Sequence, residues 1–363
     1  MYQIISYQDK EEWDRIISLF DNKDVYFSYN YCELYRNLGD GIPHLFFYQD
    51  RQGRRVCYVF LKREIDLPFL NKEKSNDIYY DIITPYGYGG PLTQNGSEQL
   101  LSEFRSRFEH YCKRENIVSE FIRFHPLLKN HQHLQQFMDT SLDRYTIYID
   151  LASDEDFSNN YHKNHLRNLK KAMRNGLEFQ VFKKAEALDI VYEFYELYKE
   201  TMKKLHASQY YYFSVDYMKS ILNRLRDKSM IAAVYSEGRM IGAALCLYEN
   251  GLLHYHLGCS KEKYLRLGTN VFLFHNIAIW GKENNLQSFH LGGGYGKNDS
   301  LFQFKQRFNQ GGETGFYIGR KVHHSELYSI FTSRWEEFYS QKQREYNFFP
   351  AYRSTPSHDL VSH

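Results

Sequence analysis

Residues 290–308 read HLGGGYGKNDSLFQFKQRF, the pattern of a short apolar strand, a glycine-rich loop and a short helix over 301–308. The three consecutive glycines, Gly292, Gly293 and Gly294, have no side chains to cover their backbone N–H groups, and loops of this kind bind anions. The GxxxxGK[ST] spacing of a nucleoside-triphosphate loop is absent. The loop is therefore predicted to hold a phosphate or carboxylate, but not as part of an NTPase.

Lys305 lies on the same face of the predicted helix as Leu301, Phe304 and Phe308. An ammonium group among apolar side chains destabilises the fold unless it is paired, reaches water at its tip or takes part in chemistry. Two interpretations stay open. The side chain reaches solvent, or it points into a cleft and stabilises the oxyanion of a tetrahedral acyl-transfer intermediate. Asp299, beside the loop, is expected to cap the helix.

The elements before this stretch follow an order that occurs twice in the 363 residues. In the first half a helix, two strands, a glycine-rich loop, a helix and a strand are predicted at 28–38, 45–49, 55–62, 85–91, 101–111 and 121–124. In the second half a helix, three strands, a helix and a strand are predicted at 188–202, 230–235, 240–248, 252–257, 270–283 and 288–291. Asn250-Gly251 is a type I′ turn signal between two of these strands.

Helix, antiparallel hairpin, glycine-bearing loop, helix and strand is the element order of the GNAT acyltransferase fold. Its repetition predicts an α+β (α/β) protein of two tandem GNAT-like domains that arose by duplication. Chance repetition of a generic α+β pattern is the alternative. A strand at 145–150 ends in the polar stretch ASDEDFSNN, so the joint is expected there, between a first domain at 1–150 and a second at 151–324.

A basic helix is predicted over 161–176, which reads YHKNHLRNLKKAMRNG. One face carries cations at spacings near i+4 and i+7, and the opposite face carries Leu166, Leu169 and Met173. The cations are Lys163, Arg167, Lys170, Lys171 and Arg174. Two interpretations stay open: the cations bind a pyrophosphate or RNA phosphates, or they form an ordinary solvated helix face.

The strand after the Asn-Gly turn contains HYHLG, from His254 to Gly258. Alternation places His254 and His256 on one face and Tyr255 on the other. No third or fourth ligand with convincing spacing accompanies the two histidines, so no metal site is predicted. Tyr255 is the better functional candidate. In GNAT folds the strand after the central hairpin borders the acyl site, where a phenol donates a hydrogen bond or protonates the leaving group.

Aromatic residues are unusually numerous, with 33 Tyr and 27 Phe. Phenols line polar grooves while their rings pack, and a large binding cleft is therefore one expectation beside an ordinary aromatic core. The run QYYYF at 209–213, which contains Tyr211 and Tyr212, resembles an aromatic wall or lid. A place in the core is the alternative for this run.

Charge and segment content argue against several classes of protein. The formal net charge of +2 gives no general case for nucleic-acid binding, and no DNA partner is expected. No apolar run approaches the ~18–20 residues of a membrane span. The first residues lack the features of a secretory signal, so a cytoplasmic location is expected. The five cysteines are scattered and never spaced as CxxC, which suggests neither disulfides nor a zinc site.

Six stretches in the same order resemble the FemAB-type family of peptidoglycan-bridge enzymes. They are PYGYGGP, RFHPLLKN, RNLKKA, LHYHLG, FHLGGG and DSLFQFKQRF, and they span nearly the whole chain. The resemblance implies twin GNAT-like domains with the main acyl-transfer cleft in the second, and a C-terminal segment, 325–363, that completes the first. It also implies direct attack of an acceptor amine on an acyl ester or thioester, with no metal and no tightly bound cofactor.

The resemblance also implies site residues. In family members that use aminoacyl-tRNA, a Phe-Lys pair in the last helix-and-loop segment serves the aminoacyl end and the developing oxyanion, and here that pair is Phe304 and Lys305. Basic residues in such enzymes bind the diphosphate of a nucleotide-linked peptidoglycan precursor. The candidates for that role are Lys163, Arg167, Lys170 and Lys171. The implied partners are a nucleotide- or lipid-linked cell-envelope precursor and aminoacyl-tRNA, with peripheral contact to the membrane.

Two departures from the family pattern leave the donor open. The long helical arm that many aminoacyl-tRNA-using relatives insert in the second domain is absent between 189 and 230. The [Q/R]xxGx[G/A] pattern of acetyl-CoA-dependent GNAT enzymes is absent too, because KYLRLGTN has Leu265 three residues before Gly268. The alternatives are an aminoacyl-tRNA donor, an acyl-CoA donor that modifies a sugar or metabolite amine, and a non-catalytic binding module on the same fold.

Overall fold

The computed structural model describes residues 2–70, 77–94, 96–153, 155–294, 296, 299–339 and 348–356. The chain forms two compact units. Unit 1 comprises residues 1–22, 26–143 and 316–363, and unit 2 comprises residues 23–25 and 144–315. The chain passes from unit 1 to unit 2 within strand β7 (Asp139–Asp150) and returns within strand β13 (Glu313–Val322).

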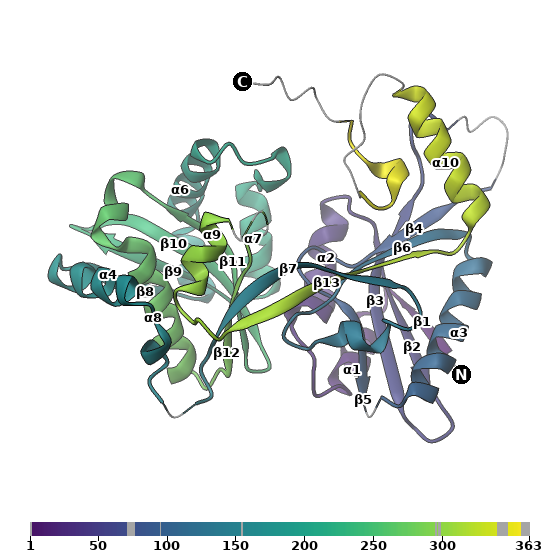
Figure 1. Cartoon of the computed structure of the whole chain (residues 1–363), viewed down its shortest axis with the longest axis horizontal. Coiled ribbons are helices and arrows are strands. Elements are labelled where there is room, and N and C mark those ends of the chain that lie inside the picture. The colour runs from purple at the N-terminus through teal and green to yellow at the C-terminus, as the bar shows by residue number, and fades with distance from the viewer. Residues whose placement is uncertain are drawn as a thin grey trace. The chain divides into compact units, whose positions relative to one another are not determined.

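Unit 1 is built on a mixed sheet (Figure 1). Its strands in spatial order are β1 (Tyr2–Ser6), β2 (Ile42–Gln49), β3 (Arg55–Glu64), β4 (Tyr80–Ile83), β6 (Ile117–Arg123) and β13, and β5 (Gly90–Gln94) pairs with β3. Neighbouring strands are antiparallel except β4 and β6, which are parallel. The predicted β2–β3 hairpin is confirmed, and its alternating residues face two different cores.

Helices cover both faces of this sheet. α3 (Glu98–Arg114) packs Phe104 and Phe108 against Phe46. α1 (Lys10–Ser18) and α2 (Tyr29–Asn37) contribute Trp13 and Cys32 to the core on the opposite face. Each of the three helices has an N-cap side chain that accepts a backbone N–H of its first turn: Asp9 for α1, Ser28 for α2 and Ser97 for α3.

The C-terminal part of the chain completes unit 1. α10 (Ser325–Phe338) and the 3₁₀ turn η7 (Ala351–Arg353) pack on the sheet around the fully buried Tyr352. The carboxylate of Asp81, also fully buried, accepts hydrogen bonds from Arg63 (2.6 Å), from Tyr352 (3.3 Å) and from Arg353. A buried carboxylate is stable when it is paired and hydrogen-bonded in this way, so these bonds hold the C-terminal segment in place.

Unit 2 repeats the strand arrangement of unit 1. Its strands in spatial order are β8 (Glu178–Phe182), β9 (Ser229–Ser236), β10 (Arg239–Glu249), β11 (Leu252–Ser260), β12 (Ser288–Gly292) and β7. The pairs β8–β9, β9–β10 and β10–β11 are antiparallel, β11 and β12 are parallel, and β12 and β7 are antiparallel. Unit 1 shows the same succession of antiparallel and parallel pairs, so the prediction of two tandem GNAT-like folds is confirmed.

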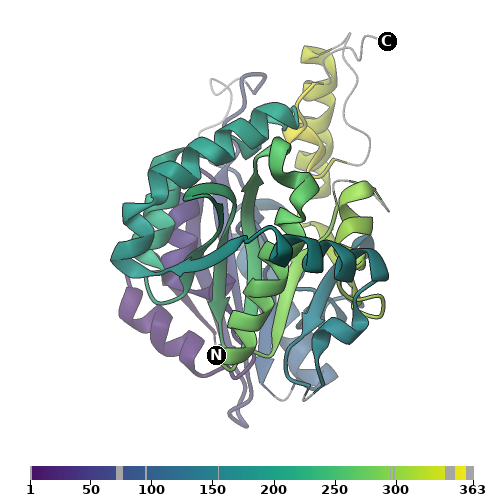
Figure 2. The same ribbon diagram turned by 90° about the vertical axis from the view of Figure 1, so that its left-hand side faces the viewer.

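Helices also cover both faces of the unit 2 sheet (Figures 1 and 2). α8 (Thr269–Glu283) lies on the face that carries Tyr255, and α4 (Lys163–Arg174) packs against α8. α6 (Val191–Lys204) and α7 (Val215–Arg224) lie on the other face, preceded by the short α5 (Lys184–Asp189). The segment 189–230 contains no longer helix, as predicted.

The remaining elements are short. α9 (Ser300–Gln306) follows the glycine loop, and 3₁₀ turns occur at η1 (Val25–Phe27), η3 (Asn130–His133), η4 (Phe157–Asn160), η5 (Gln209–Tyr211) and η6 (Glu262–Leu267). None of the helices in the described ranges combines the length and apolar character needed to cross a bilayer. The division into a first GNAT-like domain at 1–150, completed by 325–363, and a second at 151–324 that carries the main acyl-transfer cleft stays a prediction.

Candidate active site

Lys305 is buried, with 5% of its surface exposed, and lies in the last turn of α9. Asp299 caps the start of α9 by accepting the N–H of Phe302 at 2.8 Å, which confirms the expected cap. The first turn of the helix is thereby fixed, and its apolar face packs Phe302 into the core of unit 2. The interpretation in which Lys305 reaches solvent is wrong, because Lys305 lies on the buried face of α9 together with Phe302.

The ammonium of Lys305 has a sparse polar environment. Its Nζ donates to the carbonyl oxygen of Gly293 at 2.7 Å and lies 5.6 Å from the ring centroid of Tyr255. Burial lowers the pKa of Lys305 to about 7, and the carboxylate of Asp299 acts in the opposite direction. A lysine in this state binds and releases a proton near neutral pH, which is the property that acid–base and oxyanion chemistry require.

Tyr255 lies beside Lys305 because β11 contains a β-bulge. The pairing of β10 with β11 matches Cys246 with Tyr255 but Leu245 with Leu257, so His256 is the extra residue. The bulge brings Tyr255 and Gly258 to the same face, and a Cβ on Gly258 would lie only 1.6 Å from the Tyr255 hydroxyl oxygen. Only glycine leaves room for the phenol there. Sequence reasoning missed Gly258, for which the signal was a glycine within a strand pattern.

The strands β11 and β12 separate at the position of Tyr255. Their parallel pairing runs from Leu252 and Ser288 to His254 and His290, and Tyr255 is the next residue of β11. β12 instead continues in the antiparallel pairing with β7. Tyr255 therefore lies where the two parallel strands part, next to the glycine loop that follows β12.

The glycine loop supports Lys305 with its carbonyl groups. Gly292 has a φ of +75°, and a Cβ there would lie 3.5 Å from the Lys305 Nζ. The carbonyl of Gly293 accepts from Lys305, and the carbonyl of Gly294 accepts from Arg144 at 2.9 Å. These bonds use the carbonyl oxygens of the loop and not its N–H groups. The anion-binding role of Gly292, Gly293 and Gly294 therefore stays a prediction.

Phe304 belongs to a group of aromatic rings around α9. Its ring lies 5.8 Å from that of Phe274, 5.5 Å from that of Phe308 and 5.0 Å from that of His165. Phe304 is half-buried. His165 is buried and was missed by sequence reasoning, although it recurs at helical spacing with Leu169, the buried residue one turn later.

The cations of α4 form an open groove of about 530 Å³ on the surface of unit 2. Lys163, Arg167, Lys170, Lys171 and Arg174 line it together with Leu166 and Asn175. None of the five cations forms an ion pair with another described residue. The predicted apolar stripe is partly wrong. Met173 is 55% exposed, and the buried face consists of His165, Leu169 and Ala172. The pitch of 3.6 residues per turn turns Met173 away from that face.

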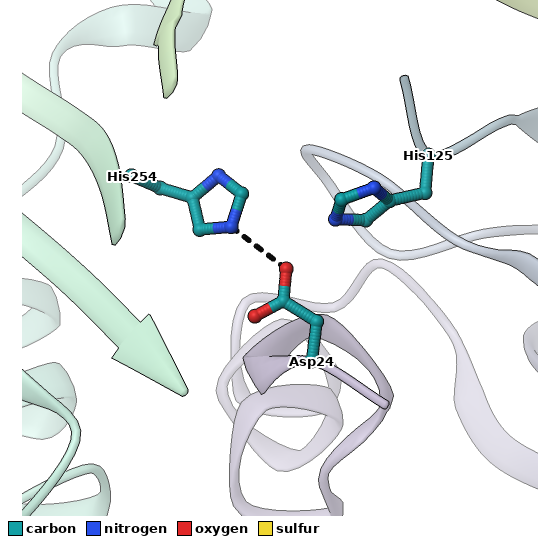
Figure 3. A group of neighbouring side chains, drawn as sticks. All are labelled: Asp24, His125 and His254. Atoms are coloured by element: carbon teal, nitrogen blue, oxygen red, sulfur yellow. Dashed lines mark hydrogen bonds and ion pairs between the residues drawn. The ribbon is translucent and has the colours of Figure 1, made fainter. Parts of the chain in front are cut away.

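His254 and His256 have separate partners. Nε2 of His254 lies 2.7 Å from the carboxylate of Asp24, and both groups are buried in unit 2 (Figure 3). Nε2 of His256 lies 3.0 Å from the hydroxyl of Tyr217 on α7. Each imidazole therefore has its own hydrogen bond within unit 2.

Tyr211 and Tyr212 lie on the α6 side of unit 2. The carbonyl of Tyr211 accepts the hydroxyl of Tyr198 at 2.6 Å, and the hydroxyl of Tyr212 donates to the carbonyl of Met202 at 3.2 Å. Tyr212 is 39% exposed, and Tyr211 is half-buried. These bonds attach the aromatic run to α6, and its role as a wall or lid stays a prediction.

Comparison with known proteins found a match to one family model and similar folds among solved structures. Residues 159–306 match the family model of the acetyltransferase (GNAT) domain. The structure is similar to that of FemX, with a TM-score of 0.68 and 12% identity over 91% of this chain and 99% of that chain. No curated protein matches the sequence.

Two further structures are similar to the whole chain. L-PGS from Bacillus licheniformis gives a TM-score of 0.57 and 14% identity, with 90% of this chain and 96% of that chain covered. The C-terminal domain of a putative lysylphosphatidylglycerol synthetase from Agrobacterium fabrum gives 0.54 and 15% identity, with 87% and 92% covered. At these identities the likeness is one of fold. Residues 159–306 therefore match a GNAT acetyltransferase domain, and the chain shares the fold of FemX.

Proposed function

We propose that the protein transfers an aminoacyl or acyl group to an amine of a cell-envelope precursor, with the reaction at Lys305. The observation that carries the proposal is the buried ammonium of Lys305, which lies beside the Tyr255 ring and donates to the Gly293 carbonyl, its one hydrogen-bond acceptor among the described residues. A buried cation without a neighbouring carboxylate bond is costly, and an oxyanion that forms during the reaction offsets that cost. The environment of Lys305 thus favours the transition state over the resting state.

The chemistry is direct displacement. The lone pair of the acceptor amine attacks the carbonyl carbon of the donor, the C=O electron pair moves to oxygen, and a tetrahedral oxyanion forms. The Lys305 ammonium stabilises that oxyanion, and the Tyr255 hydroxyl donates a hydrogen bond in the same place. The intermediate then expels the alkoxide or thiolate of the donor, and the proton lost by the attacking nitrogen passes to this leaving group. Phe304 provides an apolar wall for the transferred group.

The groove on α4 is suited to the phosphates of a substrate. Its five cations form no ion pair with another residue that the structure describes, so they raise the local concentration of anions, and Arg binds phosphate through two parallel N–H donors. A nucleotide-linked precursor, a lipid-linked precursor and an aminoacylated RNA all carry such phosphates. The solvated-face interpretation is the competing one, and it predicts that charge removal on α4 leaves every substrate affinity unchanged.

An aminoacyl ester is favoured over acyl-CoA as the donor. Helix N-termini bind the pyrophosphate of such cofactors, and the N-terminus of α8 is covered here. A Cβ on Gly268, the residue before α8, would lie 2.5 Å from the backbone oxygen of Asn168 on α4, and Thr269 is fully buried. A CoA pyrophosphate at this helix end would displace α4. The acyl-CoA alternative keeps its support from the GNAT family match.

A competition experiment tests the donor. A fluorescent RNA minihelix that carries an aminoacyl ester is bound to the purified protein and then displaced with acetyl-CoA and longer acyl-CoAs. Tight binding of the minihelix that CoA esters do not reduce supports the aminoacyl donor. Direct binding of a CoA ester, with no binding of the minihelix, replaces the proposal with an acyl-CoA-dependent reaction.

The acceptor is tested separately with the donor that binds. Transfer of a radiolabelled acyl group is measured to a nucleotide-linked peptidoglycan precursor and to its lipid-linked counterpart. The two differ in the group attached to the diphosphate, while the amine is the same. Transfer to neither precursor, with turnover on simple sugar amines, would remove the cell envelope from the proposal and leave the acyltransferase.

A further inference from the structure

The N-terminal end of α4 is hydrogen-bonded to the C-terminal end of α9. The backbone N–H of His162, which precedes α4, donates to the carbonyl of Arg307 at 2.8 Å. The imidazole Nε2 of His165, in the first turn of α4, lies 2.9 Å from the carbonyl oxygen of Phe304. The positive end of one helix dipole thus meets the negative end of the other, an arrangement that stabilises both ends.

The carbonyl of Phe304 needs this external donor. The last carbonyls of a helix have no partner within the helix, and α9 ends at Gln306. The N–H of Phe308 donates to the carbonyl of Lys305 at 3.0 Å, one residue later than an α-helical bond to Phe304 would require. His165 fills the vacant position, and its ring packs on those of Phe304 at 5.0 Å and Phe308 at 4.3 Å.

The protonation state of His165 follows from its surroundings. A carbonyl only accepts, so Nε2 carries the hydrogen. Burial lowers the pKa of His165 to about 4, the bond to Phe304 opposes this, and Arg307 and His162 act in the same direction as burial. The imidazole is therefore neutral at pH 7. Its buried Nδ1 receives no hydrogen bond from the described residues, and such an unsatisfied acceptor destabilises the fold.

We propose that His165 is a positioning residue for Lys305 and joins the reaction centre to the anion groove of α4. The bond to Phe304 fixes the turn of α9 that carries Lys305, and this keeps the ammonium between the Tyr255 ring and the Gly293 carbonyl. Because His165 belongs to the helix whose opposite face carries the cations, its bond to Phe304 is a link by which the position of α4 acts on Lys305. The inference rests on the proposed function for the role of Lys305.

The test compares three substitutions of buried histidines in unit 2. His165→Met introduces an apolar side chain of similar size and removes the Nε2–H donor. His165→Gln keeps an amide nitrogen at the same number of bonds from Cα as Nε2. His275→Met is the matched control. His275 lies on α8 and is 8% exposed; among the described residues its hydrogen bond is to the Tyr161 hydroxyl, at 3.4 Å, and not to α9.

The first measurement needs no substrate. Trace acetic anhydride labels neutral lysines, and mass spectrometry of the Lys305 peptide across pH gives the midpoint of its titration. We expect a midpoint near 7 in the wild type and in His165→Gln. In His165→Met it should rise by one pH unit or more toward the ordinary 10.5, because a displaced α9 lets water reach the ammonium. An unchanged midpoint in a folded His165→Met, or an equal shift in His275→Met, would overturn the proposal.

The second measurement is kinetic. His165→Met should lower kcat about tenfold, the size expected from one lost hydrogen bond, while KM for the donor stays constant and His165→Gln restores the rate. A purely structural role would lower the melting temperature of all three variants and leave kcat per folded molecule unchanged. If no donor is turned over, the proposed function fails, but the labelling midpoints still decide whether His165 positions Lys305.

Discussion

Unit 1 and unit 2 each bury a cation, and the two cations differ in their partners. Arg105 in unit 1 forms two parallel hydrogen bonds with Glu120, at 3.1 and 2.9 Å, and His323 lies 3.0 Å from the same carboxylate. Lys305 in unit 2 donates to the carbonyl of Gly293. The Arg105–Glu120 pair is expected to stabilise the fold, whereas the buried ammonium of Lys305 is expected to destabilise it.

The pKa values of the two sites differ in the same way. Burial would raise the pKa of Glu120, but Arg105 and His323 outweigh it and hold that pKa at about 2. Burial would lower the pKa of Arg105, and the pairing raises it instead. For Lys305 burial dominates and brings the pKa to about 7. A structural ion pair is thus locked in its charged form, whereas a group near its titration point is available for chemistry.

Removal of Arg105 should have the largest effect on stability. Arg105→Met leaves the buried carboxylate of Glu120 without its main partner, and breaking a buried pair costs about 3–5 kcal/mol. Urea unfolding measures the loss. Arg114→Met is the control, because Arg114 lies on the same helix and pairs with Glu115 at the surface, where such a pair contributes about 0–1 kcal/mol. Equal losses in the two variants would show that Arg105 and Glu120 are not a structural pair.

Removal of Lys305 should have the opposite effect. Lys305→Met is expected to lower turnover by about 10²–10³-fold, as loss of one oxyanion donor does in other enzymes. It should leave the stability equal to or above that of the wild type at pH 7, because a desolvated ammonium is replaced by an apolar chain. Lys199→Met, at an exposed Lys–Glu pair on α6, is the control. Near wild-type turnover in Lys305→Met would remove Lys305 from the mechanism.

The pH dependence should distinguish the two cations. The unfolded chain keeps the Lys305 proton up to its ordinary pKa of 10.5, but the folded chain keeps it only up to about 7. Between these values the unfolded state binds more protons, so a rise in pH favours the folded state. The stability of the wild type relative to Lys305→Met should therefore increase between pH 7 and 10. The kcat should fall above pH 7 as the ammonium is lost.

The ion pair of unit 1 should respond at acid pH instead. The folded pKa of Glu120, about 2, lies below its ordinary 4.5, so its contribution to stability is complete above pH 4.5 and is lost as the pH falls toward 2. Acid unfolding of the wild type and Arg105→Met should therefore converge over this range. Unfolding curves that stay parallel from pH 5 to 2 would contradict this assignment.

The sequence predicted the repeated elements but not how strands are shared between the halves. Hydrophobic period identified the β2–β3 and β10–β11 hairpins and the helices α3, α4 and α8 within a few residues. By contrast, the sequence of β13 cannot show that this strand pairs with β6 of unit 1. An alternation of apolar and polar residues indicates a strand, but it does not indicate which strand lies next to it. The same limit applies to β7, which comes from the first half and pairs with β12.

Sequence analysis singled out the candidate side chains but missed the residues that hold them in position. Lys305 and Tyr255 stand out because a cation among rings and a phenol on the strand after a hairpin are local patterns. Gly258 depends on a bulge, and bulges arise from the pairing of two strands. His165 depends on which helix end meets α9, a tertiary contact. The residues that hold the candidate side chains in place are therefore less visible in a sequence than the candidate side chains themselves.

The smallest predicted effect concerns the position of the Tyr255 phenol relative to Lys305. Tyr255→Phe removes the hydroxyl and should lower kcat about tenfold. Gly258→Ala keeps the hydroxyl but places a Cβ at 1.6 Å from its present position, so the ring must move, and the loss should equal or exceed that of Tyr255→Phe. Gly296→Ala is the control, because a Cβ there meets no atom of the described residues within 4 Å.

The double variant Tyr255→Phe, Gly258→Ala makes this prediction sharper. If glycine serves only to make room for the hydroxyl, the second substitution adds little once the hydroxyl is gone, and the two effects are not additive. Additive losses would mean that Gly258 acts on the backbone of β11 and not through Tyr255. In that case Gly258→Ala would report on the shape of β11, and Tyr255→Phe alone would report on the hydroxyl.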